Sequence, residues 1–438
     1  MAKGLRVGVI SLGCDKNRVD TEKMLAIVSK KYTLVSDIES AEIIIINTCA
    51  FLESSRKEAI YEILSCAQFK RDGNAQKIIV TGCLPQKFID QIKDELPEVD
   101  AFMGVSDYGS ILQVIDSICC GERVIKIGQP RGECGVERVV TTGGYAYIKI
   151  ADGCSNHCTY CLIPFIRGKY RSVPQDDIIR EAKLLGDVKE LILVAQDTAQ
   201  YGRDLSGDYS LSKLIKELSK LDSVERIRVL YCYPENVTED LIEQFKTNDK
   251  LIKYIDMPMQ HADDAVLKLM NRKGTGTSYL SLVERLKREI PGIAIRSTFI
   301  TGFPRESEEA FNNLIEFLQK AKLFNAGFFK YSKEDGTAAA RLDGQILESV
   351  KIKRLKKLYS VQKKIVKENN KQFIGKTIEV FAEGFDYNEL VYYGRAYFNA
   401  PDIDGKVYFF CDDQVEYGKY YNVKIIKATG YDLYGERV

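Results

Sequence analysis

The sequence predicts an α/β protein of three parts: an N-terminal doubly wound parallel-sheet domain (residues 1–135), a central partial (β/α)6 TIM-like barrel with a connecting helix (136–371), and a small C-terminal OB-like β-barrel (372–438). In the first part, apolar runs alternate with segments of helical period, as in RVGVISLGC followed by VDTEKMLAIVSKK. Six further strand-like runs separated by amphipathic helices follow, from YAYIKIADG to AGFFKYS. From Gln372, five short runs with Gly- and Asp-bearing turns indicate the small β-barrel.

Composition excludes several classes of protein. The chain of 438 residues has 63 Lys and Arg against 62 Asp and Glu, so its net charge of +1 creates no overall field that would attract nucleic acid. Its start lacks the apolar core of a signal peptide, and no apolar run approaches the roughly 20 residues of a membrane span. We therefore expect a cytoplasmic protein without a membrane partner. In that compartment its 12 cysteines favour metal sites or free thiols over disulfides.

Residues 153–171 contain Cys154, Cys158 and Cys161 in a C-x3-C-x2-C spacing. Three thiolates so close in sequence can supply three of the four ligands of a [4Fe–4S] cluster and leave one iron open. The spacing resembles the radical S-adenosylmethionine (SAM) superfamily, in which SAM occupies that open iron; the resemblance also implies that Tyr160 lies near the adenine. The alternatives are a structural zinc site, for which His157 could be a fourth ligand, or three buried free cysteines.

A second set of three cysteines, Cys14, Cys49 and Cys83, follows three successive strand-like runs in the first part of the chain. Because the carboxyl ends of parallel strands gather at one edge of an open sheet, these residues are predicted to meet and to hold a second three-thiolate cluster. The alternative is that they pack as small hydrophobic residues. Packing is what we expect of the other six cysteines: Cys66, Cys119, Cys120, Cys134, Cys232 and Cys411.

Polar residues stand at the carboxyl ends of several predicted barrel strands, where the active sites of such barrels lie. Aliphatic barrel interiors do not need them, so we predict that they form a pocket for SAM or substrate; each alone could instead be a satisfied polar residue or a helix cap. The predicted pocket residues are Gln196, Asp197, Gln260, His261, Arg296 and Gly302. With only 2 histidines and no G-x-S-x-G or Walker-type loop, the chain does not resemble a triad hydrolase or a P-loop NTPase.

The net charge of the C-terminal part indicates which class of partner it binds. Residues 372–438 contain 7 Lys and Arg against 11 Asp and Glu, a net charge of −4. Small β-barrels often bind RNA, but phosphate binding requires the opposite sign. An acidic module fits a basic protein partner better, and the alternative is a docking domain with no partner.

Taken together, the two cysteine sets and the β tail resemble the methylthiotransferase family, whose members carry a three-cysteine N-terminal domain, a radical SAM barrel and a TRAM domain. SLGCDKNRVD, NTCAFLESSRKEAI and GRAYFNAPDIDGKVYF look like the RimO branch, which methylthiolates an aspartate of small-ribosomal-subunit protein twelve. One departure is Asp15, where the family typically has proline.

The resemblance implies two [4Fe–4S] clusters and SAM as cofactors, with an external electron donor and a sulfur source as partners. The cluster on Cys154, Cys158 and Cys161 would cleave SAM to a radical that removes hydrogen from the β-carbon of the aspartate. A second SAM would methylate sulfur presented by the other cluster. Rival interpretations are methylthiolation of an adenosine beside the tRNA anticodon, a ribosome-binding protein with structural clusters, and a radical SAM enzyme without sulfur insertion.

Overall fold

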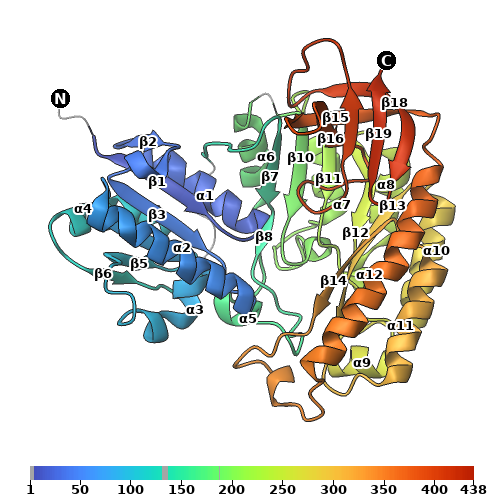
Figure 1. Ribbon diagram of the computed structural model, residues 1–438, viewed down its shortest axis with the longest axis horizontal. Helices are drawn as coiled ribbons and strands as arrows, with labels where there is room; N and C mark the ends of the chain where they lie inside the picture. Colours follow the sequence, from blue (N-terminus) through green and yellow to red (C-terminus); the bar gives the residue numbers. More distant parts are fainter. Residues whose placement is uncertain (1–3, 131–136, 187) are drawn as a thin grey trace.

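The computed structural model describes residues 4–130, 137–186 and 188–438. The predicted boundary between residues 135 and 136, and Cys134, lie outside the described residues. Three layered parts follow one another along the chain: a sheet with helices on both faces, a six-stranded barrel-like sheet, and a small closed barrel (Figure 1). The predicted fold class is thereby confirmed.

The N-terminal sheet is parallel throughout. Its strands at residues 43–48, 78–82 and 101–103 are buried, whereas both edge strands are partly exposed. Its strands, in spatial order, are β2 (Thr33–Val35), β1 (Arg6–Ser11), β3 (Ile43–Thr48), β4 (Lys77–Gly82), β5 (Ala101–Met103) and β6 (Val124–Lys126). Helices α1 (Asp15–Val28) and α4 (Ile111–Cys119) share a core on one face, and α2 (Glu53–Asp72) and α3 (Cys83–Ile92) share a core on the other. Short 3-10 turns are η1 (Ile38–Ser40) and η2 (Tyr108–Ser110).

The central sheet has the six predicted parallel strands. In spatial order they are β14 (Asn325–Lys330), β13 (Ala294–Thr301), β12 (Leu251–Asp256), β11 (Arg226–Val229), β10 (Glu190–Val194) and β7 (Tyr145–Lys149). Its helices are α5 (Ile163–Ile166), α6 (Gln175–Leu184), α7 (Leu211–Ser219), α8 (Glu239–Thr247), α9 (Asp264–Leu269), α10 (Gly276–Glu289) and α11 (Glu308–Ala321). Smaller elements are the pair β8 (Ala151–Asp152) and β9 (Arg171–Ser172), with 3-10 turns η3 (Thr198–Gln200), η4 (Pro234–Asn236) and η5 (Ala339–Arg341).

The C-terminal part begins with α12 (Glu348–Lys371), which packs on β14 and α11 and leads into a closed five-stranded barrel (Figure 1). The barrel strands, in spatial order, are β15 (Thr377–Asp386), β16 (Val391–Arg395), β17 (Val407–Phe410), β19 (Asp432–Arg437) and β18 (Tyr420–Thr429). Closure leaves no strand edge exposed. The expectation of five short strands is confirmed.

The concave face of the open central sheet is filled by the other two parts of the chain. Val19 of α1 lies in one hydrophobic core with Tyr147 and Ile192, whose strands form that sheet, and with Phe381 and Phe398 of the C-terminal part. The six strands of the central sheet do not close into a barrel, because β7 and β14 do not pair with each other. Here its open interior is covered by a helix from one side and a small barrel from the other.

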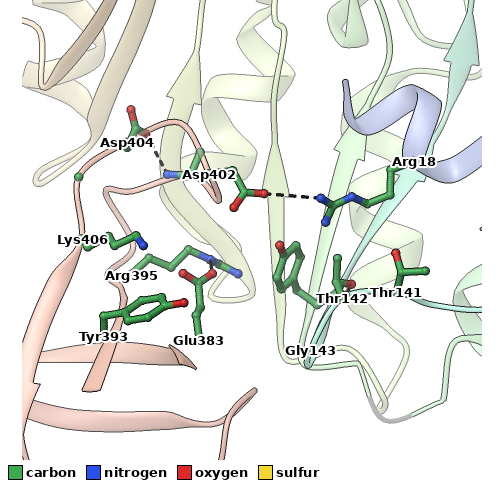
Figure 2. A pocket seen from close by; sticks show the side chains of 13 residues that line it. Arg18, Thr141, Thr142, Gly143, Glu383, Tyr393, Arg395, Asp402, Asp404 and Lys406 are labelled. Atoms are coloured by element: carbon green, nitrogen blue, oxygen red, sulfur yellow. Dashed lines mark hydrogen bonds and ion pairs between the residues drawn. The ribbon is translucent and has the colours of Figure 1, made fainter. Parts of the chain in front are cut away.

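A cavity of about 300 Å³ remains where α1, residues 141–145 and the C-terminal barrel meet. Figure 2 shows Arg18 of α1 directed toward Asp402, whose carboxylate lies 3.9 Å away. None of the residues predicted to bind cofactor or metal lines this cavity. No helix in the described parts of the chain is long and apolar enough to cross a membrane.

A buried ion-pair cluster joins the C-terminal barrel to the central sheet. The Glu190 carboxylate, with no solvent exposure, accepts from Nε of Arg228 at 2.7 Å and from the guanidinium of Arg395. Burial opposes its charged form, yet the two guanidinium groups hold the pKa of Glu190 below its ordinary value. The same carboxylate therefore neutralises one cation from each part.

Replacing Glu190 by Gln should destabilise this junction by about 3–5 kcal/mol, because it leaves two buried guanidinium groups without their counter-charge. Since the folded pKa is depressed, the stabilisation is complete at neutral pH and is lost as the pH falls below about 4.3. Differential scanning calorimetry at pH 7 and at a series of values from about pH 5 to about pH 2 measures both effects. Glu379→Gln is the control, because its pair with Arg226 crosses the same junction but is exposed and should cost at most about 1 kcal/mol. Equal losses in the two variants would contradict this account.

Candidate functional site

The three N-terminal cysteines lie where β1, β3 and β4 end, at one edge of the sheet. Gly13 and Gly82, immediately before Cys14 and Cys83, share a left-handed φ of +97°. A Cβ on Gly13 would lie 2.6 Å from the Cβ of Cys49, so only glycine lets the two loops approach this closely. Glycine at this position therefore allows cysteines that are distant in the sequence to come close together.

Burial holds the thiols of Cys49 and Cys83 in their neutral form. Burial and the nearby Cys14 raise the pKa of Cys49, and burial raises that of Cys83 to about 12 despite the nearby Arg167. Such thiols are neutral at pH 7 in the protein alone, and a bound metal removes their protons. The set therefore fits a metal cluster that brings its own positive charge.

The second set lies on the loop after β8. Burial raises the pKa of Cys154 to about 11, and burial together with the nearby Cys158 raises the pKa of Cys161 above its ordinary value. The Cys158 sulfur lies 3.4 Å from the Tyr233 hydroxyl, and the Ile163 N–H donates to the Cys161 sulfur at 3.4 Å. Donors of this kind stabilise cluster thiolates.

The zinc alternative would need a fourth ligand beside Cys154, Cys158 and Cys161. Among the described residues, no three His, Cys, Asp or Glu side chains are grouped tightly enough to hold one metal ion. A zinc ion would need four ligands at about 2.0–2.3 Å, whereas a four-iron cube holds its thiolates further apart. His157 is exposed, with a left-handed φ of +52°.

Arg167, six residues after Cys161, connects the two sets. Its guanidinium is 2% exposed and lies 3.0 Å from Asp20 of α1 and 3.1 Å from Asp152. It also donates to Asn17 at 2.6 Å and lies 3.9 Å from the Cys83 sulfur. Burial opposes the charge, yet Asp152 and Asp20 hold the pKa of Arg167 above its ordinary value. One cation from the barrel loop is thus fixed inside the N-terminal part.

Two of the predicted pocket residues line a common cavity. Tyr160 and Gln260 face a mostly apolar space of about 200 Å³, together with Phe51 and Leu52, which follow Cys49. Gln260 has a left-handed φ of +72°, which is a strained conformation for this residue. The cavity thus brings together residues next to both cysteine sets.

The side chains of Gln196 and Asp197 form hydrogen bonds with neighbouring residues of the protein. Gln196 donates to Asp152 at 3.0 Å, within the network around Arg167. Asp197 is fully buried and accepts from Asn236 at 2.7 Å and from Asn156 of the cysteine loop at 3.3 Å. A role of either residue toward SAM stays a prediction.

His261, Arg296 and Gly302 also have partners within the protein. Burial lowers the pKa of His261 to about 4, so this histidine is neutral, and its Nδ1 accepts from the Asp263 N–H at 3.0 Å. The Gly302 N–H donates to Glu306. Arg296 donates to Asp256 at 2.8 Å. These three residues too keep their predicted roles only as predictions.

Sequence reasoning missed several residues beside the cysteines. The Arg272 guanidinium stacks 4.0 Å from the Tyr233 ring centroid, and its buried Nε and Nη1 find no hydrogen-bond partner in the described parts of the chain. The Lys16 ammonium lies 3.4 Å from the Tyr231 ring centroid. For Lys16, its place two residues after Cys14 was the one feature of the sequence that could have indicated a role. No local sequence pattern distinguishes Arg272, Tyr231 or Tyr233.

The remaining cysteines divide into two groups. Cys66 and Cys232 are buried, as expected of packing residues, and Cys411 is half-buried. Cys119 and Cys120 are exposed, so the expectation of packing is wrong for this pair. They end α4 on the surface, where the helix presents its last turn to solvent.

Comparison with protein families divides the chain in three. Residues 6–104 match the uncharacterized protein family UPF0004, residues 148–318 match the Radical SAM superfamily, and residues 374–438 match the TRAM domain.

Several curated relatives that align with nearly the whole chain have the same name. Proteins named ribosomal protein uS12 methylthiotransferase RimO from Clostridium botulinum (strain Eklund 17B / Type B) and Thermoanaerobacter sp. (strain X514) are each 45% identical over 436 residues. These alignments cover 98% of this chain and 97% and 99% of the relatives. The protein of that name from Lachnoclostridium phytofermentans is 43% identical over 437 residues, which cover 98% of this chain and 99% of the relative.

Among solved structures, the cobalamin-dependent SAM radical enzyme OxsB with aqua-cobalamin bound matches with a TM-score of 0.51 at 12% identity. The match covers 82% of this chain and 56% of the OxsB chain, so the chain spans little more than half of that protein. This likeness concerns the fold alone.

Iron analysis tests both cysteine sets. After anaerobic reconstitution we expect about eight irons per chain, and Cys83→Ala should reduce this to about four because it removes one ligand of the N-terminal set. Cys66→Ala, a buried cysteine in the same part of the chain, should leave the iron content unchanged. A wild-type content of about four irons would contradict the assignment of a second cluster.

Proposed function

The chain belongs to the family of ribosomal protein uS12 methylthiotransferases named RimO, and we propose that it adds a methylthio group to the β-carbon of an aspartate in uS12, using two [4Fe–4S] clusters and SAM. As a member of this radical SAM family it is a transferase of a sulfur-containing group. The site of modification, the number of clusters and the roles of SAM belong to the proposal.

One observation carries the proposal: a single short segment after β11 reaches both cysteine sets. The Tyr231 hydroxyl donates to Asp15, the residue after Cys14, at 3.3 Å, and the Tyr233 hydroxyl lies 3.4 Å from the Cys158 sulfur. Sulfur transfer requires that hydrogen removal and sulfur delivery occur at the same carbon. Two cysteine sets that share one segment of backbone meet this requirement.

Cys154, Cys158 and Cys161 would hold the cluster that binds SAM, and Cys14, Cys49 and Cys83 would hold the cluster that carries sulfur. When bound, these groups supply one-electron chemistry, a radical that abstracts hydrogen, and methylated sulfur. The residues of the chain supply position: Arg167 fixes the loop after Cys161 against Asp20 of α1. Cys83, Cys154 and Cys158 are buried, which would keep water from those ligands.

SAM would lie between Cys158 and the apolar cavity lined by Tyr160 and Gln260. Arg272 would hold its carboxylate, because two buried donors of this guanidinium have no partner among the described residues. A charged donor with free N–H groups is well suited to a carboxylate.

The proposal includes an external electron donor and a sulfur source, and the ribosomal substrate implies a cytoplasmic enzyme. tRNA is the less favoured substrate. The net charge of −4 over residues 372–438 opposes phosphate binding and suits a basic protein.

Mass spectrometry tests the proposal. Anaerobically reconstituted enzyme with SAM, reductant and sulfide is offered isolated uS12 or small ribosomal subunits in one reaction and bulk tRNA in another. We expect one aspartate of uS12 to gain the mass of a methylthio group in place of hydrogen. The gain on a tRNA nucleoside, with none on uS12, would overturn the proposed substrate.

Two variants separate the clusters in the same assay. Cys158→Ala should abolish SAM cleavage, since it removes a ligand of the SAM-binding cluster. Cys49→Ala should retain formation of 5′-deoxyadenosine and yet deliver no methylthio group. Methylthiolated uS12 from Cys49→Ala would contradict the two-cluster mechanism.

A further inference from the structure

Lys16, two residues after Cys14, has its ammonium group enclosed between the N-terminal part and the central sheet. The side chain is 10% exposed, and the ammonium lies 3.1 Å from the Asp15 carboxylate. Its other neighbour is the face of Tyr231, 3.4 Å away at the ring centroid, which favours a cation. A buried ammonium needs a carboxylate partner, and in the free protein Asp15 provides it.

The Asp15 carboxylate is an incomplete partner. One oxygen accepts from the Lys16 ammonium at 3.1 Å, from the Lys16 backbone N–H at 3.1 Å and from the Tyr231 hydroxyl at 3.3 Å. The other oxygen is buried and has no hydrogen-bond partner among the described residues. Leaving a carboxylate oxygen unpaired in a buried place costs free energy. Asp15 therefore occupies a carboxylate-binding position with only one of its two oxygens hydrogen-bonded.

The backbone of Tyr231, whose ring and hydroxyl contact Lys16 and Asp15, is in a strained conformation. Its φ of +60° is left-handed, which is unfavourable for an aromatic residue. Asp256 accepts its N–H at 3.2 Å, and Arg296 in turn pairs with Asp256 at 2.8 Å. The predicted residue Arg296 thus supports the ring and hydroxyl that face Lys16.

A group that binds a carboxylate at this place would suit the proposed reaction. In an aspartate side chain the carboxyl carbon is bonded directly to the β-carbon, so whatever holds the carboxylate also positions the carbon that reacts. The other cations beside the two cysteine sets are otherwise engaged: Arg167 pairs with Asp20 and Asp152, and Arg272 faces the Cys158 side through its contact with Tyr233.

We propose that Lys16, with the Tyr231 hydroxyl, binds the side-chain carboxylate of the target aspartate, which takes the position held by Asp15 in the free enzyme. This rests on the proposed function and names the residue that selects aspartate as the substrate side chain. Asp15, where the family typically has proline, acts as a competing internal carboxylate. No covalent step is assigned to Lys16; it binds and orients.

The test compares the affinity of the reconstituted enzyme for isolated uS12 with aspartate or asparagine at the modified position. Wild-type enzyme should prefer the aspartate form by about ten- to one-hundred-fold, as expected for a hydrogen-bonded ion pair in a buried site. Lys16→Met should abolish this preference, and Lys16→Arg should restore part of it. Loss of affinity by the same factor for both forms would overturn the proposal.

Two further variants complete the design. Arg18→Met removes a cation from the same helix, one directed to Asp402, and should leave the preference unchanged. Asp15→Asn removes the competing charge and should increase the preference for the aspartate form; an unchanged or smaller preference would overturn the proposal, even if Lys16→Met loses its clusters. Iron content and melting temperature are measured for every variant.

The same preparations separate this inference from the function on which it rests. If wild-type enzyme methylthiolates the aspartate form of uS12 and Lys16→Met keeps the preference, only the inference fails. If wild-type enzyme adds no methylthio group to uS12, the proposed function fails and the inference fails with it.

Discussion

The buried guanidinium of Arg167 is the interaction on which the arrangement depends. It belongs to the barrel loop that carries one cysteine set, and it pairs with Asp20 and donates to Asn17, both of which lie on the helix that follows Cys14. Removing a partner from such a buried charge costs about 3–5 kcal/mol. Separating the N-terminal part from the central barrel is therefore unfavourable. Leu162 on the same loop is buried in the core of the N-terminal sheet. Charge and apolar contact therefore fix the same joint.

The central sheet is open, and this allows the N-terminal and C-terminal parts to pack against its concave face. Six strands leave the concave face uncovered, and α1 and the C-terminal barrel cover it from two sides. Tyr231 and Tyr233 stand at the end of a middle strand, facing one cysteine set each. An eight-stranded barrel would have filled this space with its own side chains. The incomplete barrel instead shares its concave face with the loops that carry the two cysteine sets.

The sequence was sufficient for the strands and for the gathering of cysteines, because a buried parallel strand and the residue at its end are adjacent in the chain. Polar residues at strand ends were predicted by position alone, and position does not tell where a side chain points: Arg296 meets Asp256, and His261 is held neutral in the core. Lys16 and Tyr231 could not be paired from sequence, because their contact exists only once the two parts dock.

Magnetic coupling between the two clusters tests the central claim, that both cysteine sets lie at one joint. Electron paramagnetic resonance of the fully reduced, anaerobically reconstituted protein would be compared with spectra of Cys83→Ala and Cys158→Ala, which each keep one cluster. The account predicts a wild-type spectrum broadened by spin–spin interaction and absent from either variant. A wild-type spectrum equal to the sum of the two single-cluster spectra would contradict it, because independent clusters could not act on one carbon.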